Sequence, residues 1–197
     1  MHTIHNTEGF ILKSVNFGEA NKYFFIFTSE FGLIKAAAQG SRLLKSKLRY
    51  GLEDFSLGSF SFVRGREVWR LISAEKKLVL NHSREGSSNE NFLLISRIFS
   101  LLLRLLHGEE KNSLLFDSLK EGFIFLKQNN LDGGTLADFE CIMALRILAA
   151  LGYIGKLSQF DKFTTSPYFT QELLTSMSTL KTQAILEINK SLKETHL

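Results

Sequence analysis

Apolar residues in the first eighty positions occur in short runs, which is the spacing of strands rather than helices. The apolar residues between Glu8 and Lys13 predict a first short strand. Residues 23–28 (YFFIFT) are aromatic or β-branched, which indicates a strand covered on both faces or closed into a barrel. Residues 33–38 continue as a third strand after the turn at 29–32.

Two further strands are predicted after a long excursion, over 55–63 and 67–74. Arg64-Gly65-Arg66 between them reads as a three-residue hairpin loop, with Gly65 at the position that needs a positive φ. Five short strands with a long connection after the third predict a small closed barrel. The OB-fold is the five-stranded member of this class, although periodicity alone does not separate it from an SH3-like barrel.

The apolar period becomes helical after residue 88. Ser87 and Glu90 have the spacing of a capping box. A second helix is expected over 114–127, and Thr135 with Asp138 is expected to cap a third that runs to Gly152. A terminal amphipathic helix carries the apolar stripe Leu173, Met177, Leu180, Ala184, Ile188 and Leu192.

These patterns predict an α+β chain of two domains. Residues 1–80 form a five-stranded OB-fold β-barrel that binds nucleic acid, residues 81–88 a linker, and residues 89–197 an all-helical domain. Charge follows the same division, because residues 1–80 carry 12 Lys and Arg against 7 Asp and Glu, whereas residues 81–197 carry 12 against 13. A polyanion-binding front and a near-neutral rear are the simplest interpretation.

The basic character is concentrated in residues 40–51, where four cations fall within eight residues and no acid occurs between Glu30 and Glu53. The commonest explanation for such a run of like charges is a ligand whose phosphates neutralise it. A solvated basic loop without a ligand would explain the run too. As a helix, the run would place Arg42, Lys45 and Arg49 on one face. Leu44, Leu48 and Leu52 would then form the other face, which would suit a membrane surface or a partner groove.

Exposed rings beside cations would form a stacking platform for single strands. Phe24, Phe25, Phe27, Phe60, Phe62 and Trp69 are expected mostly in the barrel core, with one alternating set facing outward. Tyr50, which follows the cations directly, is the preferred stacking ring. The predicted nucleic-acid-binding residues are Lys35, Arg42, Lys45, Lys47, Arg49, Tyr50, Arg64, Arg66 and Arg70.

Catalytic chemistry finds little support in the sequence. Cys141 is the single cysteine, which excludes an intrachain disulfide and a multi-cysteine zinc site and fits a reducing compartment. No phosphate loop, serine elbow or zinc-protease motif occurs. We therefore expect a binding protein without enzyme activity, cofactor or metal. Without a signal-peptide pattern, and with residues 92–106 too short to span a bilayer, a cytoplasmic protein is expected.

Two segments of the front half resemble the RecO family of bacterial recombination mediators. The first is Glu8-Gly9-Phe10-Ile11-Leu12-Lys13, followed by Gly18-Glu19 and by Phe27-Thr28 with Phe31-Gly32-Leu33. The second is Ala38-Gln39-Gly40-Ser41-Arg42, followed by Lys45-Ser46-Lys47-Leu48-Arg49 and Leu52-Glu53. In the rear half, only residues 148–153 (LAALGY) resemble the family. The resemblance implies an OB-fold joined to a helical domain, and binding of single- and double-stranded DNA. It further implies strand annealing, and loading of the recombinase RecA with RecR onto DNA coated by single-strand DNA-binding protein.

The chain departs from the family pattern at two places. Phe160 stands about where many members have the first of four zinc cysteines, and the usual proline after residues 148–153 is replaced near Gly155. The resemblance therefore does not extend to functions of the rear domain, including docking of the single-strand DNA-binding protein. The alternative function is an OB-fold that binds RNA, or a protein-interaction scaffold without annealing activity.

Overall fold

The computed structural model describes residues 3–79, 88–155 and 158–194. The chain divides into two compact units. Residues 1–80 and 107–113 form the barrel unit, and residues 81–106 and 114–197 form the helical unit. The predicted α+β class, a five-stranded barrel followed by helices, is confirmed. The predicted linker at 81–88 falls almost wholly outside the described residues, and Ser88 already begins the first helix.

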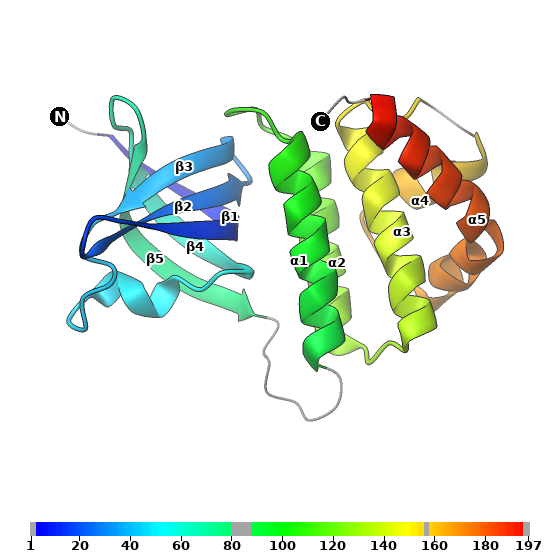
Figure 1. The fold of residues 1–197 in the computed structure, drawn as a ribbon, viewed down its shortest axis with the longest axis horizontal. Coiled ribbons are helices and arrows are strands. Elements are labelled where there is room, and N and C mark those ends of the chain that lie inside the picture. The colour runs from blue at the N-terminus through cyan, green and yellow to red at the C-terminus, as the bar shows by residue number, and fades with distance from the viewer. Residues whose placement is uncertain (1–2, 80–87, 156–157, 195–197) are drawn as a thin grey trace. The chain divides into compact units, whose positions relative to one another are not determined.

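The barrel unit contains five strands: β1 (Ile4–Phe17), β2 (Asn21–Thr28), β3 (Gly32–Ala38), β4 (Ser56–Val63) and β5 (Trp69–Val79). They close in the order β1-β2-β3-β5-β4, with antiparallel neighbours except for a short parallel pairing of β3 with β5 (Figure 1). The closing pairing is short, because β3 and β5 meet only at Ala36 with Trp69 and at Ala37 with Arg70.

Side-chain alternation along β2 places aromatic residues on both faces of the strand. Phe24 and Ile26 point into the barrel, whereas Tyr23 and Phe25, which alternate with them, are half-buried. Phe27 is fully buried but does not belong to the core of the barrel. The buried residues that form the core of the barrel are Ile11, Phe24, Ile26, Ile34, Ala36, Ala38, Phe60, Phe62, Trp69 and Leu71.

The loop between β4 and β5 differs from the predicted three-residue hairpin. It spans residues 64–68, since β4 ends at Val63 and β5 begins at Trp69. Gly65 is not among the residues with positive φ, so the predicted reason for this glycine is wrong. A Cβ at Gly65 would lie 2.2 Å from the Val68 carbonyl oxygen, so glycine is needed because the backbone approaches closely.

The connection between β3 and β4 is not one amphipathic helix, so that alternative is wrong. Turns and bends lead into a short 3₁₀ helix, η1 (Lys47–Gly51). Leu48 and Leu52 pack against the barrel core, whereas the Leu44 side chain is 81% exposed. The apolar side of this segment therefore covers the barrel's own interior, and the cations are left toward solvent.

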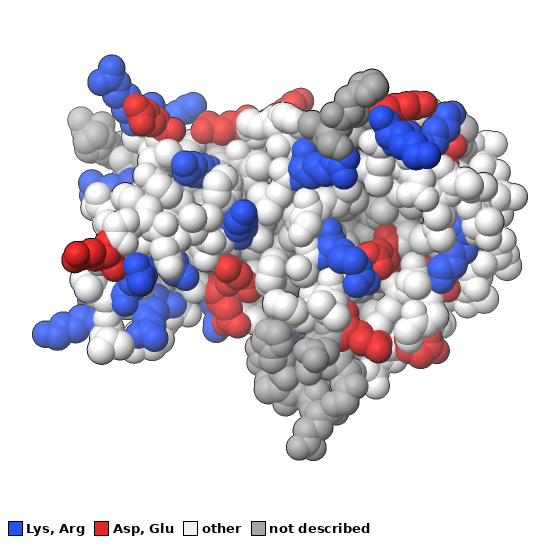
Figure 2. All heavy atoms as spheres, viewed as in Figure 1, with Lys and Arg blue, Asp and Glu red and all other residues white. Residues whose placement is uncertain are grey.

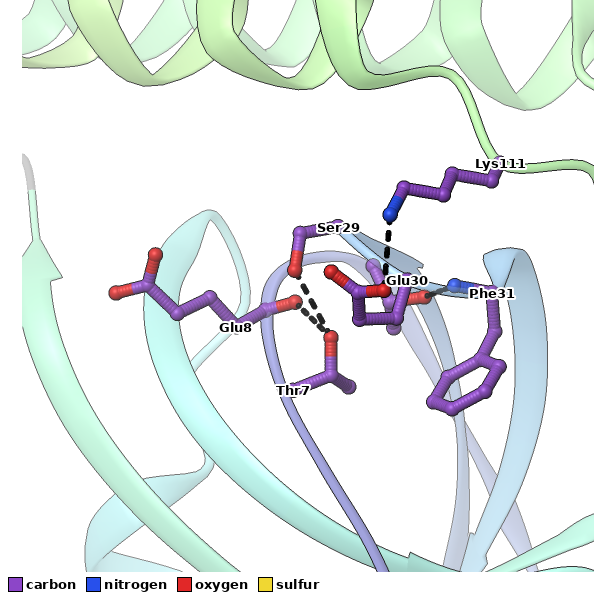
Figure 3. A network of polar contacts seen from close by, with 7 residues as sticks. Thr7, Glu8, Ser29, Glu30, Phe31 and Lys111 are labelled. Carbon is purple, nitrogen blue, oxygen red and sulfur yellow. Dashed lines mark hydrogen bonds and ion pairs between the residues drawn. The ribbon is translucent and has the colours of Figure 1, made fainter.

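Polar and close backbone contacts hold residues 107–113 to the barrel. The Glu109 carboxylate accepts hydrogen bonds from the Trp69 indole N–H (2.8 Å) and from the Arg64 guanidinium (3.1 Å). The Lys111 ammonium pairs with Glu30 at 2.9 Å (Figure 3). Gly32, with φ of 66°, lies so close that a Cβ there would be 2.2 Å from the Glu110 carbonyl oxygen. Only glycine fits this position.

The helical unit contains α1 (Ser88–Leu105), α2 (Ser113–Gln128), α3 (Gly133–Ala150), η2 (Ser158–Phe160), α4 (Asp161–Thr164) and α5 (Gln171–Glu194). Asp132, rather than the predicted Thr135 and Asp138 pair, caps α3. Its carboxylate accepts from the Thr135 backbone N–H at 2.8 Å, and this hydrogen bond lowers the pKa of Asp132. Ser87 of the other predicted cap lies outside the described residues. No described helix is both long and apolar enough to cross a bilayer.

Helix α5 packs against α3, with Leu174, Met177, Ala184, Ile188 and Ser191 buried. The predicted apolar stripe was partly wrong in register, because Leu174 is buried where Leu173 is half-buried. Leu180 and Leu192 are half-buried as well. The apolar face of a helix is wider than one residue per turn. The most buried position can therefore shift from Leu173 to Leu174 while the predicted helix itself stays the same.

Arg146 is a charged side chain buried within the helical unit. Arg146 of α3 is 2% exposed, and it donates to the carbonyl oxygens of Phe163 (2.7 Å), Pro167 (2.8 Å) and Tyr168 (2.9 Å). Its guanidinium also lies 4.1 Å from the centroid of the Phe169 ring. Burial lowers the pKa of Arg146 to about 10. This arginine therefore fixes the segment that leads into α5.

Candidate nucleic-acid interface

The outer face of β1, β2 and β3 carries aromatic rings beside lysines. The Tyr23 ring stacks on Phe17, with ring centroids 4.1 Å apart and planes 14° apart. The Lys35 ammonium lies 4.3 Å from the centroid of the Tyr23 ring. Phe25 pairs in register with Lys13 on β1 and with Lys35 on β3. We call these five residues, Lys13, Phe17, Tyr23, Phe25 and Lys35, the ring face.

The ring face follows from strand alternation. In β2, Tyr23 and Phe25 alternate with the core positions Phe24 and Ile26 and point outward. The register brings their partners on β1 and β3 to the same side. Each ring is half-buried, and the stacked Phe17 and Tyr23 cover one face of each other while part of each ring stays open to solvent. The arrangement provides a flat apolar surface that a base can stack on and cations that a phosphate can reach.

A second feature is a pocket of about 510 Å³ beside the basic run. It is lined by Lys22, Phe24, Ser41, Arg42, Arg49, Tyr50, Leu52, Glu53 and Lys76. Tyr50 is 78% exposed, so its ring is at the surface while its neighbour Gly51 is buried. We call this feature the loop pocket.

Hydrogen bonds fix the start of the basic run against the turn between β1 and β2. The Asn21 side-chain oxygen accepts from the Gly40 backbone N–H at 2.8 Å. Arg42 donates its backbone N–H to Ala20 O (3.0 Å) and its guanidinium to Gly18 O (3.3 Å). Arg42 is therefore held in place by neutral acceptors, which leave its charge uncompensated.

Ion pairs separate the cations of the barrel unit into two groups. Lys76 pairs with Glu53 at 2.8 Å, and Arg64 pairs with Glu109 at 3.1 Å. Within the described residues, the following cations have no acidic partner within ion-pair distance: Lys13, Lys22, Lys35, Arg42, Lys45, Lys47, Arg49, Arg66 and Arg70. Figure 2 shows Lys and Arg gathered over the part of the barrel unit where Figure 1 draws the segment between β3 and β4.

All nine predicted site residues are exposed, and they fall into three groups. Lys35 belongs to the ring face. Arg42, Arg49 and Tyr50 line the loop pocket, with Lys45 and Lys47 on the same connection. Arg64, Arg66 and Arg70 lie on the β4–β5 loop and the start of β5, where Arg64 also lies 5.4 Å from the Trp69 ring centroid.

Sequence reasoning missed the aromatic part of the ring face. Tyr23 and Phe17 were not singled out, and neither were Lys13 and Lys22 among the cations. The signal was available in principle, because strict alternation along residues 21–28 places Tyr23 opposite to Phe24. It was hidden because both faces of this strand carry rings, so composition did not show which set points inward.

A five-stranded barrel that closes in the order β1-β2-β3-β5-β4 is an OB-fold domain, and this one carries half-buried rings and exposed cations on its outside. Residues 1–77 match the family described as Recombination protein O N terminal. This match confirms the resemblance to the RecO family.

Full-length relatives show the same similarity. The chain is 30% identical to the DNA repair protein RecO of Alkaliphilus metalliredigens, over 59% of this chain and 54% of that protein. It is 28% identical to the DNA repair protein RecO of Clostridium novyi, over 77% of this chain and 57% of that protein. The protein of the same name from Gloeothece citriformis is 41% identical over 75 residues, which are 38% of this chain and 26% of that protein. The chain thus spans about half the length of the first two relatives and less of the third.

Proposed function

We propose that the chain is a DNA-binding recombination mediator of the RecO type. In this role it binds single-stranded DNA, anneals complementary strands and assists recombinase loading during recombinational DNA repair. The ring face is the observation that carries the proposal, because Tyr23 and Lys35 combine a stacking surface with a cation on an OB-fold barrel. The family match of residues 1–77 supports the same assignment.

Annealing requires that two strands approach although their phosphates repel each other. Cations without acidic partners, such as Arg49 and Lys35, neutralise phosphates and release condensed counterions. Stacking and phosphate contacts leave the Watson–Crick edges of the bases free for pairing. A surface built from rings and cations therefore suits annealing better than one that reads base edges.

The proposal describes binding rather than catalysis, so it requires no cofactor or enzyme activity. The partners it names are single- and double-stranded DNA, RecR, RecA and the single-strand DNA-binding protein, and its place of action is the cytoplasm. The names of the relatives support a role in DNA repair. RecR and the other protein partners rest on the family resemblance alone.

Titration of a fluorescent single-stranded oligonucleotide with the full chain tests the proposal. Log affinity should fall with log salt by about 0.7 per phosphate engaged. Replacing Lys35 with Gln should lower both affinity and slope, whereas Lys127→Gln, an exposed residue at the end of α2, should change neither.

Annealing of complementary oligonucleotides is measured in parallel, and an RNA strand of the same sequence serves as the comparison. Annealing no faster than in buffer would refute the mediator role. Tighter binding of RNA than of DNA would favour the alternative of an RNA-binding OB-fold, since RNA alone offers a 2′-hydroxyl. Absence of binding at low salt would leave the scaffold alternative.

A further inference from the structure

The loop pocket is separate from the ring face in both residues and shape. The ring face is an outer strand surface, whereas the pocket lies where β2, β5 and the β3–β4 connection meet, and no residue is shared between them. Its volume of about 510 Å³ falls within the range of roughly 300–1,000 Å³ typical of small-ligand sites. A single nucleotide unit is a ligand of this size.

Charge in the pocket selects the chemistry of its ligand. Four of its lining residues, Lys22, Arg42, Arg49 and Lys76, are cations, against the one carboxylate of Glu53. That carboxylate is paired with Lys76 at 2.8 Å, so its charge is already compensated. Lys22 donates to the Ser14 hydroxyl at 3.5 Å and Arg42 donates to a backbone carbonyl, and neither contact neutralises a charge. The remaining positive charge favours an anion with several acceptor oxygens, which describes a phosphate.

Apolar surface in the same pocket makes a bare phosphate an incomplete ligand. The exposed Tyr50 ring and the half-buried Leu52 line it together with Phe24, whose ring lies 6.0 Å from the Lys22 ammonium. A base or sugar attached to the phosphate would cover part of this surface. Tyr50 offers the flat face on which a base stacks, since every base has a π-face.

We propose that the loop pocket holds one nucleotide of a DNA strand, with its phosphate bound by Arg42 and Arg49 and its base against Tyr50. This inference rests on the proposed DNA-binding function and deepens it. The hydrogen bonds that hold Gly40 and Arg42 to the β1–β2 turn keep the pocket in place before a ligand arrives. The pocket therefore gives the strand one fixed point, while the ring face makes sequence-tolerant contacts.

The test is a two-dimensional NMR titration of the full chain with deoxyadenosine monophosphate and, separately, with deoxyadenosine. The monophosphate should shift the signals of Ser41, Arg42, Arg49 and Tyr50, and the nucleoside should bind at least tenfold more weakly. Arg49→Gln should weaken monophosphate binding about tenfold, the loss expected for one charge-assisted hydrogen bond. Lys47→Gln removes a charge from the same 3₁₀ helix outside the pocket and should weaken it less than threefold.

Two further arms separate a strand end from an internal nucleotide. Short oligonucleotides with and without a 5′-phosphate should bind the wild type differently if the pocket takes a terminus, and alike if it takes an internal unit. In either case Arg49→Gln should lower their affinity more than Lys47→Gln does.

Nucleotide binding in the loop pocket is refuted if the monophosphate shifts only signals of the ring face, or shifts none at millimolar concentration. The proposed function still stands in that case, provided that the chain binds oligonucleotides. Equal effects of the Arg49 and Lys47 variants on monophosphate binding also refute nucleotide binding in the loop pocket. Loss of all oligonucleotide binding in the wild type would instead refute the proposed function.

Discussion

Two arginines show how differently the two units use the same side chain. Arg49 of η1 is exposed, and no acidic side chain of the described residues lies within ion-pair distance of it. Arg146 of α3 is buried, and three backbone carbonyls accept its hydrogen bonds. A buried charge must be satisfied within the fold, whereas an exposed one needs only water and remains available to a ligand.

The comparison extends to the units around them. The barrel unit carries its cations on the outside and fills its interior with rings and aliphatic side chains. The helical unit carries an arginine inside, at the point where residues 163–168 lead into α5. Mutations that remove charge should therefore affect ligand binding in the first unit and stability in the second.

Removal of α5 should have the largest effect. Ending the chain at Thr170 exposes the α3 surface and deletes the buried Leu174, Met177 and Ile188. At roughly 1.5–3 kcal/mol each, these side chains together approach the ~5–15 kcal/mol that stabilises a domain. Circular dichroism should show loss of cooperative helical melting, while oligonucleotide binding by the barrel unit persists. A helical transition like that of the full chain would show that α5 is dispensable.

The Arg146→Met variant should have the next largest effect. Methionine fills similar space but leaves the carbonyls of Phe163, Pro167 and Tyr168 without their donor. Unpaired buried acceptors of this kind should lower the free energy of unfolding by about 3–5 kcal/mol. Chemical denaturation measures the loss, with the exposed Arg104→Met as the matched control. Equal stability of the two variants would contradict the structural role of Arg146.

Within the barrel unit, Tyr23→Leu should weaken single-strand binding without a comparable loss of stability. Stacking of a base on an aromatic ring contributes about 1–3 kcal/mol, so a five- to hundredfold loss of affinity is expected. Tyr50→Leu should give a loss of the same order if a base stacks there too. Anisotropy titration at fixed salt measures both, and a thermal melt of each variant verifies the fold. Unchanged affinity for Tyr23→Leu would remove the ring face from the binding site.

The smallest effect is expected at the surface pair of Lys111 and Glu30. Both side chains are 50% exposed, and pairs of this kind contribute about 0–1 kcal/mol because solvent screens them. Lys111→Met should therefore change the free energy of unfolding by less than about 1 kcal/mol, measured by denaturant titration. A larger loss would mean that the attachment of residues 107–113 depends on this lysine rather than on Glu109 and Gly32.

The sequence predicted the elements of the barrel well because strand periodicity and turn glycines are local signals. It did not predict the contact of Glu109 with Trp69, because these residues are 40 positions apart and no pattern links them. Gly65 was assigned the wrong physical reason, since close backbone approach and positive φ both select glycine. Leu44 and Leu48 looked alike in sequence, and only the barrel's closure decides which of them is covered.

For the candidate site, too, the sequence predicted the features that depend on neighbouring residues and missed those that depend on residues far apart in the chain. The cations of the basic run were visible as a charge cluster, and the structure leaves them exposed. The ring face depends on register between three strands, which the sequence of any one strand does not contain. Arg146 lay in an apolar helical pattern, where sequence alone does not show that carbonyls from residues 163–168 converge on it.

Trp69 is the only tryptophan of the chain, and its indole N–H donates to the Glu109 carboxylate. The emission of an indole depends on the polarity and hydrogen bonding around it. The protein therefore contains an intrinsic fluorescent reporter for the attachment of residues 107–113 to the barrel. Detachment of that segment can be followed in the unlabelled wild-type chain by exciting a single chromophore, with Glu109→Gln as the spectral reference.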